Sequence, residues 1–275
     1  MKSSRLLWIT VGSAALLSTL LLLSGFIYAI LDILYPKPSD LGAPPQLSVS
    51  KEDSLQVKKE IRIIALGDSL SKGTGDETGE GYVNRVKMKL IAQLKKPVFV
   101  ENYAVNGWRA DNLLNYLNQP NVPNLLVQAD VILLTIGGND LNQAAANPIN
   151  STPSNVKQEF SEINYDSVRQ SLAIAEEKLK LILTKIAEIN PKAKIIYISL
   201  YQPYLNADPK REGAAIVQDW NRKAESVVNL FPNMAVIPTF DLFQFQLEKY
   251  LFVDDFHPNG AGYERIADRV VQALQ

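Results

Sequence analysis

The stretch "RIIALGDSLSKGTGDE" (Arg62–Glu77) joins a short apolar run to a turn of small and polar residues. The run "IIAL" has no polar interruption, as is typical of a strand that helices cover on both faces. Gly67 allows a sharp turn directly after the run, and Ser69 follows it closely. In open parallel sheets, functional groups collect at the carboxyl ends of the strands. The stretch therefore predicts a parallel α/β domain with Ser69 at its functional edge.

The chain after Ile61 repeats this alternation. "VILLTI" and "KIIYISL" are nearly continuous apolar runs, and Tyr165–Ile189 has apolar residues at helical spacing. The order predicts a three-layer α/β/α domain with a parallel sheet. The polar stretch Leu141–Asn164 is expected to be a loop or flap over a site. The expected strands are Arg62–Leu66, Val98–Tyr103, Val131–Ile136, Lys194–Leu200 and Ala235–Pro238, and the other expected helices are Tyr82–Lys95, Asn112–Leu117, Ala214–Leu230 and Ala261–Leu274.

The N-terminal segment has a different character. From Leu6 to Leu31 no residue is charged, and a helix of that length spans about 39 Å, against about 30 Å for the hydrocarbon core of a bilayer. Lys2 and Arg5 precede this run, so the positive-inside rule predicts a cytoplasmic N-terminus and an extracytoplasmic domain. A single-pass cell-membrane protein is expected. The alternative is a cleaved signal peptide and secretion, which the length of the run disfavours.

Three segments follow from these patterns: a signal-anchor at 1–35, a Pro-rich and polar stalk at 36–60, and the α/β domain at 61–275. The chain has 28 basic and 29 acidic residues, a balance that gives no field to attract nucleic acid, so no nucleic-acid partner is expected. It has no cysteine and one histidine, which excludes thiolate sites and multi-histidine metal sites.

That single histidine, His257, determines how Ser69 is interpreted. A serine hydroxyl is a poor nucleophile unless a base removes its proton, and His257 is the only imidazole in the chain. Asp254 stands three residues before it, close enough to accept the Nδ1–H and direct Nε2 to the serine. Each feature alone also has an ordinary explanation, because Gly-Asp-Ser turns cap helices and a histidine before proline is usually a loop residue.

Four segments together are more specific: "IIALGDSL" (63–70), "NYAVNG" (102–107), "TIGGND" (135–140) and "DDFHPN" (254–259). With them the chain resembles the GDSL or SGNH hydrolases, a family of lipases and acylhydrolases. The resemblance implies a flavodoxin-like sheet of five parallel strands between helices. The elbow G-x-S-x-G is absent, because position 71 is serine, and this argues against the ordinary α/β-hydrolase fold.

The resemblance also implies a role for each matching residue. Ser69 would be the nucleophile and His257 the base and then the acid, while the backbone N–H groups of Ser69 and Gly107 and the side-chain amide of Asn139 would form the oxyanion hole. Asp254 would orient the histidine, with the neighbouring Asp255 as the reserve candidate.

The expected reaction is ester hydrolysis through an acyl-enzyme, without a cofactor or metal. The substrate is expected to be a small-molecule, lipid or glycan ester, with Trp108 and Tyr204 at its binding site because their segments follow strands. The phenylalanines before His257 are expected mainly in the core. Two alternatives remain open: removal of acetyl groups from a cell-wall or extracellular polysaccharide, and an anchored binding module without catalysis.

Overall fold

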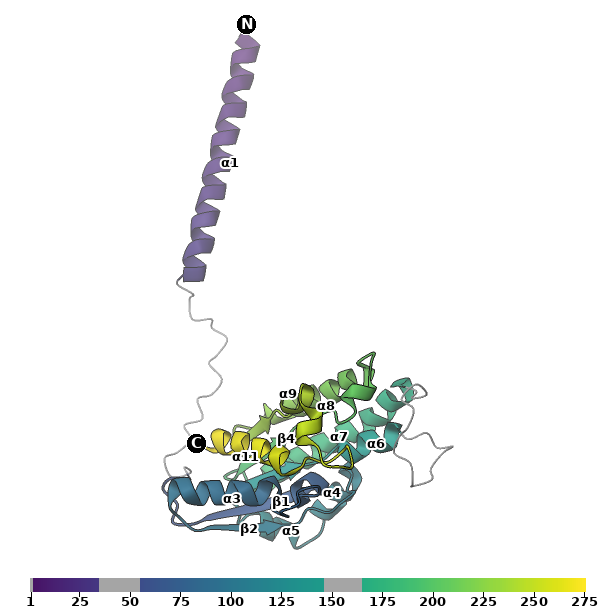
Figure 1. Cartoon of the computed structure of the whole chain (residues 1–275). Helices are drawn as coiled ribbons and strands as arrows, with labels where there is room; N and C mark the ends of the chain where they lie inside the picture. The colour runs from purple at the N-terminus through teal and green to yellow at the C-terminus, as the bar shows by residue number, and fades with distance from the viewer. Residues whose placement is uncertain (1, 35–54, 146–164) are drawn as a thin grey trace. The chain divides into compact units, whose positions relative to one another are not determined.

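The computed structural model describes residues 2–34, 55–145 and 165–275, and the chain divides into two compact units, Met1–Ser48 and Val49–Gln275 (Figure 1). The described part of the first unit is one helix, α1 (Lys2–Leu34). Within it, the 24 residues Trp8–Leu31 are sufficient in length and composition to cross a membrane. Helix α1 is therefore a candidate for a membrane span or a signal sequence.

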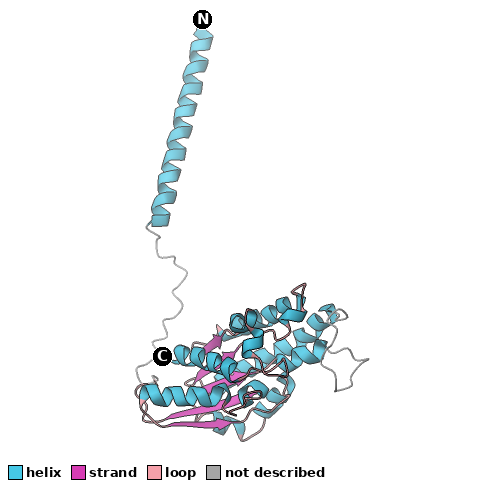
Figure 2. Ribbon diagram, in the orientation of Figure 1, coloured by secondary structure: helices cyan, strands magenta, loops and turns pink. Residues whose placement is uncertain are grey.

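The second unit is built on five parallel strands in the order β2-β1-β3-β4-β5 (Figure 2). The strands are β1 (Ile61–Gly67), β2 (Val98–Asn102), β3 (Val131–Thr135), β4 (Lys194–Ile198) and β5 (Met234–Ile237). The chain runs from β1 to β2 on one side and then crosses to β3 on the other. The carboxyl ends of β1 and β3 consequently flank a topological switch point, where ligand sites form in sheets of this kind.

Helices bury both faces of the sheet, which explains why the strands read as continuous apolar runs. Ile64 and Ile132 point into a core shared with α4, α7 and α8, whereas Ile63 and Val131 point into one shared with α3 and α11. These helices are α3 (Gly81–Leu94), α4 (Ala110–Leu117), α7 (Tyr165–Ile189), α8 (Glu212–Val228) and α11 (Gly260–Leu274). Shorter helices in the described chain are α2 (Ser69–Lys72), α5 (Val122–Leu126), α6 (Gly138–Ala145), η3 (Leu205–Ala207), α9 (Phe240–Gln244) and α10 (Leu247–Tyr250).

Gly67 ends β1 where that strand lies closest to β3. Its φ is +115°, and a Cβ built on it would lie 1.8 Å from the carbonyl oxygen of Thr135. Only glycine fits between the two backbones at this point. The fit fixes the position at which the next residues, Asp68 and Ser69, leave the sheet.

The predicted fold class is confirmed, and each predicted strand lies within two residues of an observed one. Two segments, one assigned to a loop and one to the stalk, differ from the predictions. Residues 141–145, assigned to the start of a loop, belong to α6, and the rest of that predicted flap, 146–164, lies outside the described residues. Residues 55–60, assigned to the stalk, pack on the domain: Leu55 is 1% exposed and Lys58 pairs with Asp130 at 2.5 Å. The rest of the expected stalk is outside the described residues.

Candidate active site

Ser69 is the first residue of α2, directly beyond the end of β1. Asp68 caps this helix, because its carboxylate accepts the backbone N–H of Leu70 at 3.1 Å. The same Oδ1 accepts a hydrogen bond from the Thr135 hydroxyl at 2.7 Å, which ties the turn to the end of β3. Burial raises the pKa of Asp68, against the hydrogen bonds from Thr135 and Leu70. The turn that carries Ser69 is thus held by side chains of the sheet edge.

The His257 ring lies between Ser69 and Asp254. Its Nε2 is 2.8 Å from Ser69 Oγ, and its Nδ1 is 2.6 Å from Asp254 Oδ2. Burial alone would raise the pKa of Asp254, but hydrogen bonds from the His257 ring and from backbone N–H groups hold it below its usual value. An ionised carboxylate can only accept a hydrogen bond, so Nδ1 carries a proton. In the neutral imidazole, Nε2 is then free to accept the hydroxyl proton of Ser69.

The loop that carries His257 is fixed by contacts on several sides. Asp254 Oδ1 accepts the backbone N–H groups of Phe256 and His257, at 3.0 and 2.9 Å. The Tyr201 hydroxyl donates to the carbonyl of Phe256 at 2.6 Å, and the Phe256 ring meets the imidazole edge-on at 4.8 Å between centroids. Asn259 caps α11 and donates to the carbonyl of Leu251 at 2.9 Å. These contacts position the imidazole before any substrate binds.

The predicted oxyanion-hole residues follow β2 and β3, the two strands on either side of β1. Gly107, with φ of +78°, lies in the loop after β2, and Asn139 is in the first turn of α6 after β3. The Asn139 side-chain amide donates to the carbonyl of Trp108 at 2.9 Å, so the segment after β3 is linked directly to the segment after β2. A second link comes from Asp140, whose Oδ2 accepts the backbone N–H of Ala110 at 3.0 Å. Burial raises the pKa of Asp140 to about 6.

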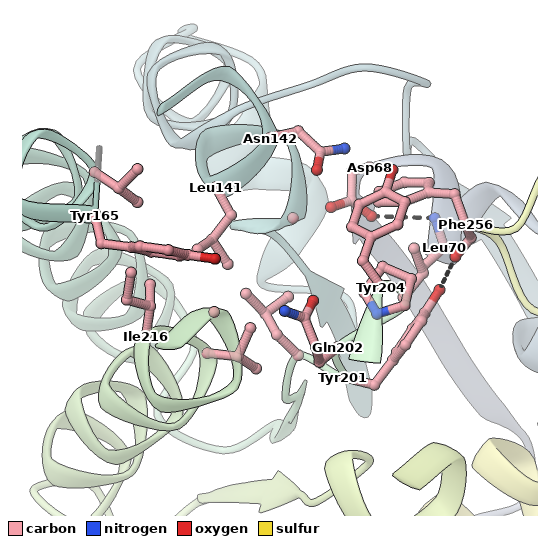
Figure 3. Close-up of a pocket in the computed structure, with 16 residues that line it drawn as sticks. Asp68, Leu70, Leu141, Asn142, Tyr165, Tyr201, Gln202, Tyr204, Ile216 and Phe256 are labelled. Carbon is pink, nitrogen blue, oxygen red and sulfur yellow. Dashed lines mark hydrogen bonds between the residues drawn. The ribbon is translucent and has the colours of Figure 1, made fainter. Parts of the chain in front are cut away.

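A cavity of about 260 Å³ opens beside these residues (Figure 3). Tyr204, which is expected from the sequence at a substrate-binding site, lines this cavity, and its ring stacks on Phe256 at 6.1 Å between centroids. Trp108 is not among the lining residues and instead packs on Tyr116, with ring centroids 5.4 Å apart. Because Trp108 follows a strand, its backbone lies near the site, but its side chain packs against the core.

Sequence reasoning missed much of the cavity wall. Leu141 on α6, Tyr165 on α7 and Ile216 on α8 all line it. Each belongs to a different helix, and apolar spacing along a helix does not distinguish a residue that faces a cavity from one that faces the core. The expectation that the phenylalanines are mainly core residues fits Phe243, which is 1% exposed, but not Phe245, which is 86% exposed.

Among residues 2–34, 55–145 and 165–275 no group of three or more His, Cys, Asp or Glu side chains is placed to hold a metal ion.

Comparisons with known proteins identify relatives of this chain in both sequence and structure. Residues 65–265 match the GDSL-like Lipase/Acylhydrolase family. The chain is 34% identical to the uncharacterized protein YpmR of Bacillus subtilis, over 82% of this chain and 86% of that protein. It is 27% identical to the spore germination lipase LipC of Bacillus licheniformis, over 76% of this chain and 94% of that protein.

Solved structures with the same fold include a lipase from a goat rumen metagenome and the acetylxylan esterase Axe2 of Geobacillus stearothermophilus. The lipase matches with a TM-score of 0.64 and 26% identity, over 78% of this chain and 97% of its own. Axe2 matches with a TM-score of 0.55 and 16% identity, over 78% of this chain and 94% of its own. At that identity, the likeness to Axe2 shows the fold alone.

Proposed function

Because this chain belongs to the GDSL-like lipase/acylhydrolase family and is therefore an ester-bond hydrolase, we propose that it cleaves carboxylic esters with Ser69 as nucleophile. The observation that carries the proposal is the unbroken chain of contacts from Ser69 Oγ to His257 Nε2 and from His257 Nδ1 to Asp254. The contacts support the proposal because a serine hydrolase needs its nucleophile, base and orienting carboxylate within hydrogen-bonding distance of one another.

The reaction begins when Ser69 Oγ attacks the ester carbonyl carbon and His257 Nε2 takes the hydroxyl proton. Asp254 stabilises the imidazolium that forms, since its carboxylate accepts the Nδ1–H. The carbonyl oxygen becomes an oxyanion, which the backbone N–H groups of Ser69 and Gly107 and the Asn139 amide are proposed to bind. Removing one donor of this kind typically lowers kcat by about 10²–10³.

The tetrahedral intermediate then collapses. The bond between the carbonyl carbon and the alkoxy oxygen breaks, and His257 returns its proton to that oxygen, so the alcohol leaves and an acyl group remains on Ser69. A water molecule, deprotonated by His257, attacks the acyl-enzyme in the same way and releases the carboxylic acid. The cycle restores the free hydroxyl and the neutral imidazole, and no cofactor enters it.

Replacement of the nucleophile tests this mechanism. In the full-length protein, Ser69→Ala should reduce hydrolysis of p-nitrophenyl esters to background and abolish labelling by a fluorophosphonate probe. Ser226→Ala is a matched control, because Ser226 is exposed on α8 and bonds only to the carbonyl of Lys223 among its described contacts. Turnover that persists in a folded Ser69→Ala protein would rule out this nucleophile.

The proposal also gives α1 the role of a membrane anchor that holds the hydrolase domain outside the cytoplasm. Support comes from the uncharged span Trp8–Leu31 and the cations Lys2 and Arg5 before it. Mass spectrometry of the mature protein separates this arrangement from secretion. An anchor predicts a membrane-bound chain that retains α1, whereas a cleaved signal predicts a mature chain in the medium that lacks it.

A further inference from the structure

The cavity described above begins beside the proposed catalytic residues, at their neighbours in the chain. Asp68 and Leu70, the two neighbours of Ser69 in the chain, both line it, as does Phe256, the residue before His257. In Figure 3 these three side chains lie together at one end of the cavity. One arm of an ester whose carbonyl carbon meets Ser69 Oγ would therefore extend into this space.

The opposite end is made by two helices. Tyr165 and Val168 line it from the start of α7, and Ile216 and Val217 from the first turns of α8. Figure 3 shows Tyr165 and Ile216 across the cavity from Asp68 and Phe256. Val168, Ile216 and Val217 are at most 3% exposed and form an aliphatic wall continuous with the core, to which Tyr165 adds an aromatic ring with a hydroxyl group.

Most of the lining residues between the two ends are apolar or aromatic. The polar groups there are the amides of Asn142 and Gln202 and the hydroxyls of Tyr201 and Tyr204, and the Tyr201 hydroxyl donates to the carbonyl of Phe256. A sugar ring presents hydroxyl groups around its whole edge, and each one that enters without a partner carries a desolvation cost. A methylene chain has no such requirement and is stabilised by every aliphatic group that it covers. The lining thus favours a hydrocarbon occupant.

We propose that this cavity is the acyl-chain site of the enzyme and that it selects esters of medium-chain acids, of about eight to ten carbon atoms. The proposal rests on the function proposed above and names the substrate class for the same site. A dry cavity of about 150 Å³ holds benzene, or about 25 Å³ for each carbon atom. By that measure the 260 Å³ cavity accommodates a chain of about ten carbon atoms.

The order of product release also assigns this space to the acyl half. The alcohol leaves first, while the acyl group is still bonded to Ser69, so the alcohol needs an open exit. The acyl group stays until water releases it, and its chain remains against the aliphatic wall during that time. An acetyl group would leave most of the cavity unfilled.

A chain-length series on the full-length protein in nanodiscs tests the site, with p-nitrophenyl acetate, hexanoate, octanoate, decanoate and palmitate as substrates. Each buried methylene is worth up to about fourfold in kcat/KM, equivalent to about 0.8 kcal/mol. We expect kcat/KM to rise at least about 100-fold from acetate to octanoate and to fall again at palmitate.

Two variants fill the cavity, Ile216→Trp at the far end and Leu141→Trp between the ends. Both should lower kcat/KM for octanoate and decanoate by at least about tenfold and move the optimum to hexanoate or shorter. The matched control is Ala215→Trp, because Ala215 is exposed on the same turn of α8 and does not line the cavity. Circular dichroism shows which variants are folded. Leu141 is only partly buried, so Leu141→Trp is the variant that tests the site if Ile216→Trp does not fold.

Binding without chemistry separates the cavity from the catalytic mechanism. Radiolabelled decanoate should bind Ser69→Ala protein in nanodiscs, and Ser69→Ala/Ile216→Trp protein in the same nanodiscs is the blank. Decanoate binding with no turnover by the wild type would refute the proposed nucleophile and keep the cavity assignment. Turnover with a flat chain-length profile, an unaltered profile in both filling variants, or binding equal to the blank would refute the acyl-chain site.

Discussion

Substitution of Gly75, in the turn after α2, tests whether the position of the imidazole limits the rate. Gly75 has φ of +91°, and a Cβ added to it would lie 2.8 Å from His257 Cβ and 2.7 Å from the carbonyl oxygen of Pro258. Ordinary contacts begin near 3.4 Å, so in Gly75→Ala the histidine has to move by about 0.6 Å or more. A misplacement of about 1 Å at reacting groups costs about 10² in rate, and we expect kcat to fall by about 10–10².

The control for this prediction is Gly79→Ala. Gly79 also has a positive φ, +71°, but an added Cβ meets nothing within 4 Å. Both substitutions carry the backbone strain of an alanine at positive φ, about 1–2 kcal/mol, and only Gly75→Ala displaces His257. The assay is steady-state hydrolysis of p-nitrophenyl octanoate, with thermal unfolding to compare stability. Equal kcat losses in the two variants, or a folded Gly75→Ala protein with wild-type kcat, would refute the reasoning.

Two further predictions concern carboxylates. Asp254→Asn should lower kcat by about 10³–10⁴, because an amide can donate to His257 Nδ1 and so favour the tautomer with its proton on Nε2. Asp255→Asn should change kcat less than about threefold, and similar losses in both variants would remove Asp254 from its role. Burial raises the pKa of Asp140 to about 6, so the folded state binds its proton more tightly than the unfolded chain, and stability falls as pH rises from about 4 to 6. Asp140→Asn keeps an acceptor for the Ala110 N–H and should raise the free energy of unfolding at pH 8, with no gain at pH 4. The gain is at most about 3 kcal/mol, because the side chain is partly exposed. Urea titrations at the two pH values measure it, and an equal gain at both would contradict a cost of burying the charged carboxylate.

The sheet was predictable because its strands are buried on both faces. In β3 every residue is buried, so the apolar run marks the strand almost to its ends. Helix α6 was not predicted, since Asn142 and Gln143 within it give a polar composition that reads as a loop. The boundary of the domain near Leu55 was also missed, because one apolar residue in a polar segment gives no periodicity, although its side chain is fully packed.

Part of the candidate site could also be predicted from the sequence, and part could not. The contact between Ser69 and His257 was expected from a resemblance in sequence, since the spacing of residues 188 positions apart carries no local signal. The cavity wall was not predictable, because Tyr165 and Ile216 become neighbours only when α7 and α8 pack beside the sheet. Backbone placement of Trp108 followed from the strand that precedes it, but the direction of its side chain depends on Tyr116, which lies on the next helix.

The distance along the chain between Ser69 and His257 has a consequence for biosynthesis. A ribosome makes the serine 188 residues before the imidazole, and strands β2 to β5 are translated between the two. Every shorter nascent or truncated chain holds the hydroxyl without any base to activate it. Under the proposed mechanism such a chain does not hydrolyse esters, and activity begins only after His257 has been made and its loop has folded beside Ser69.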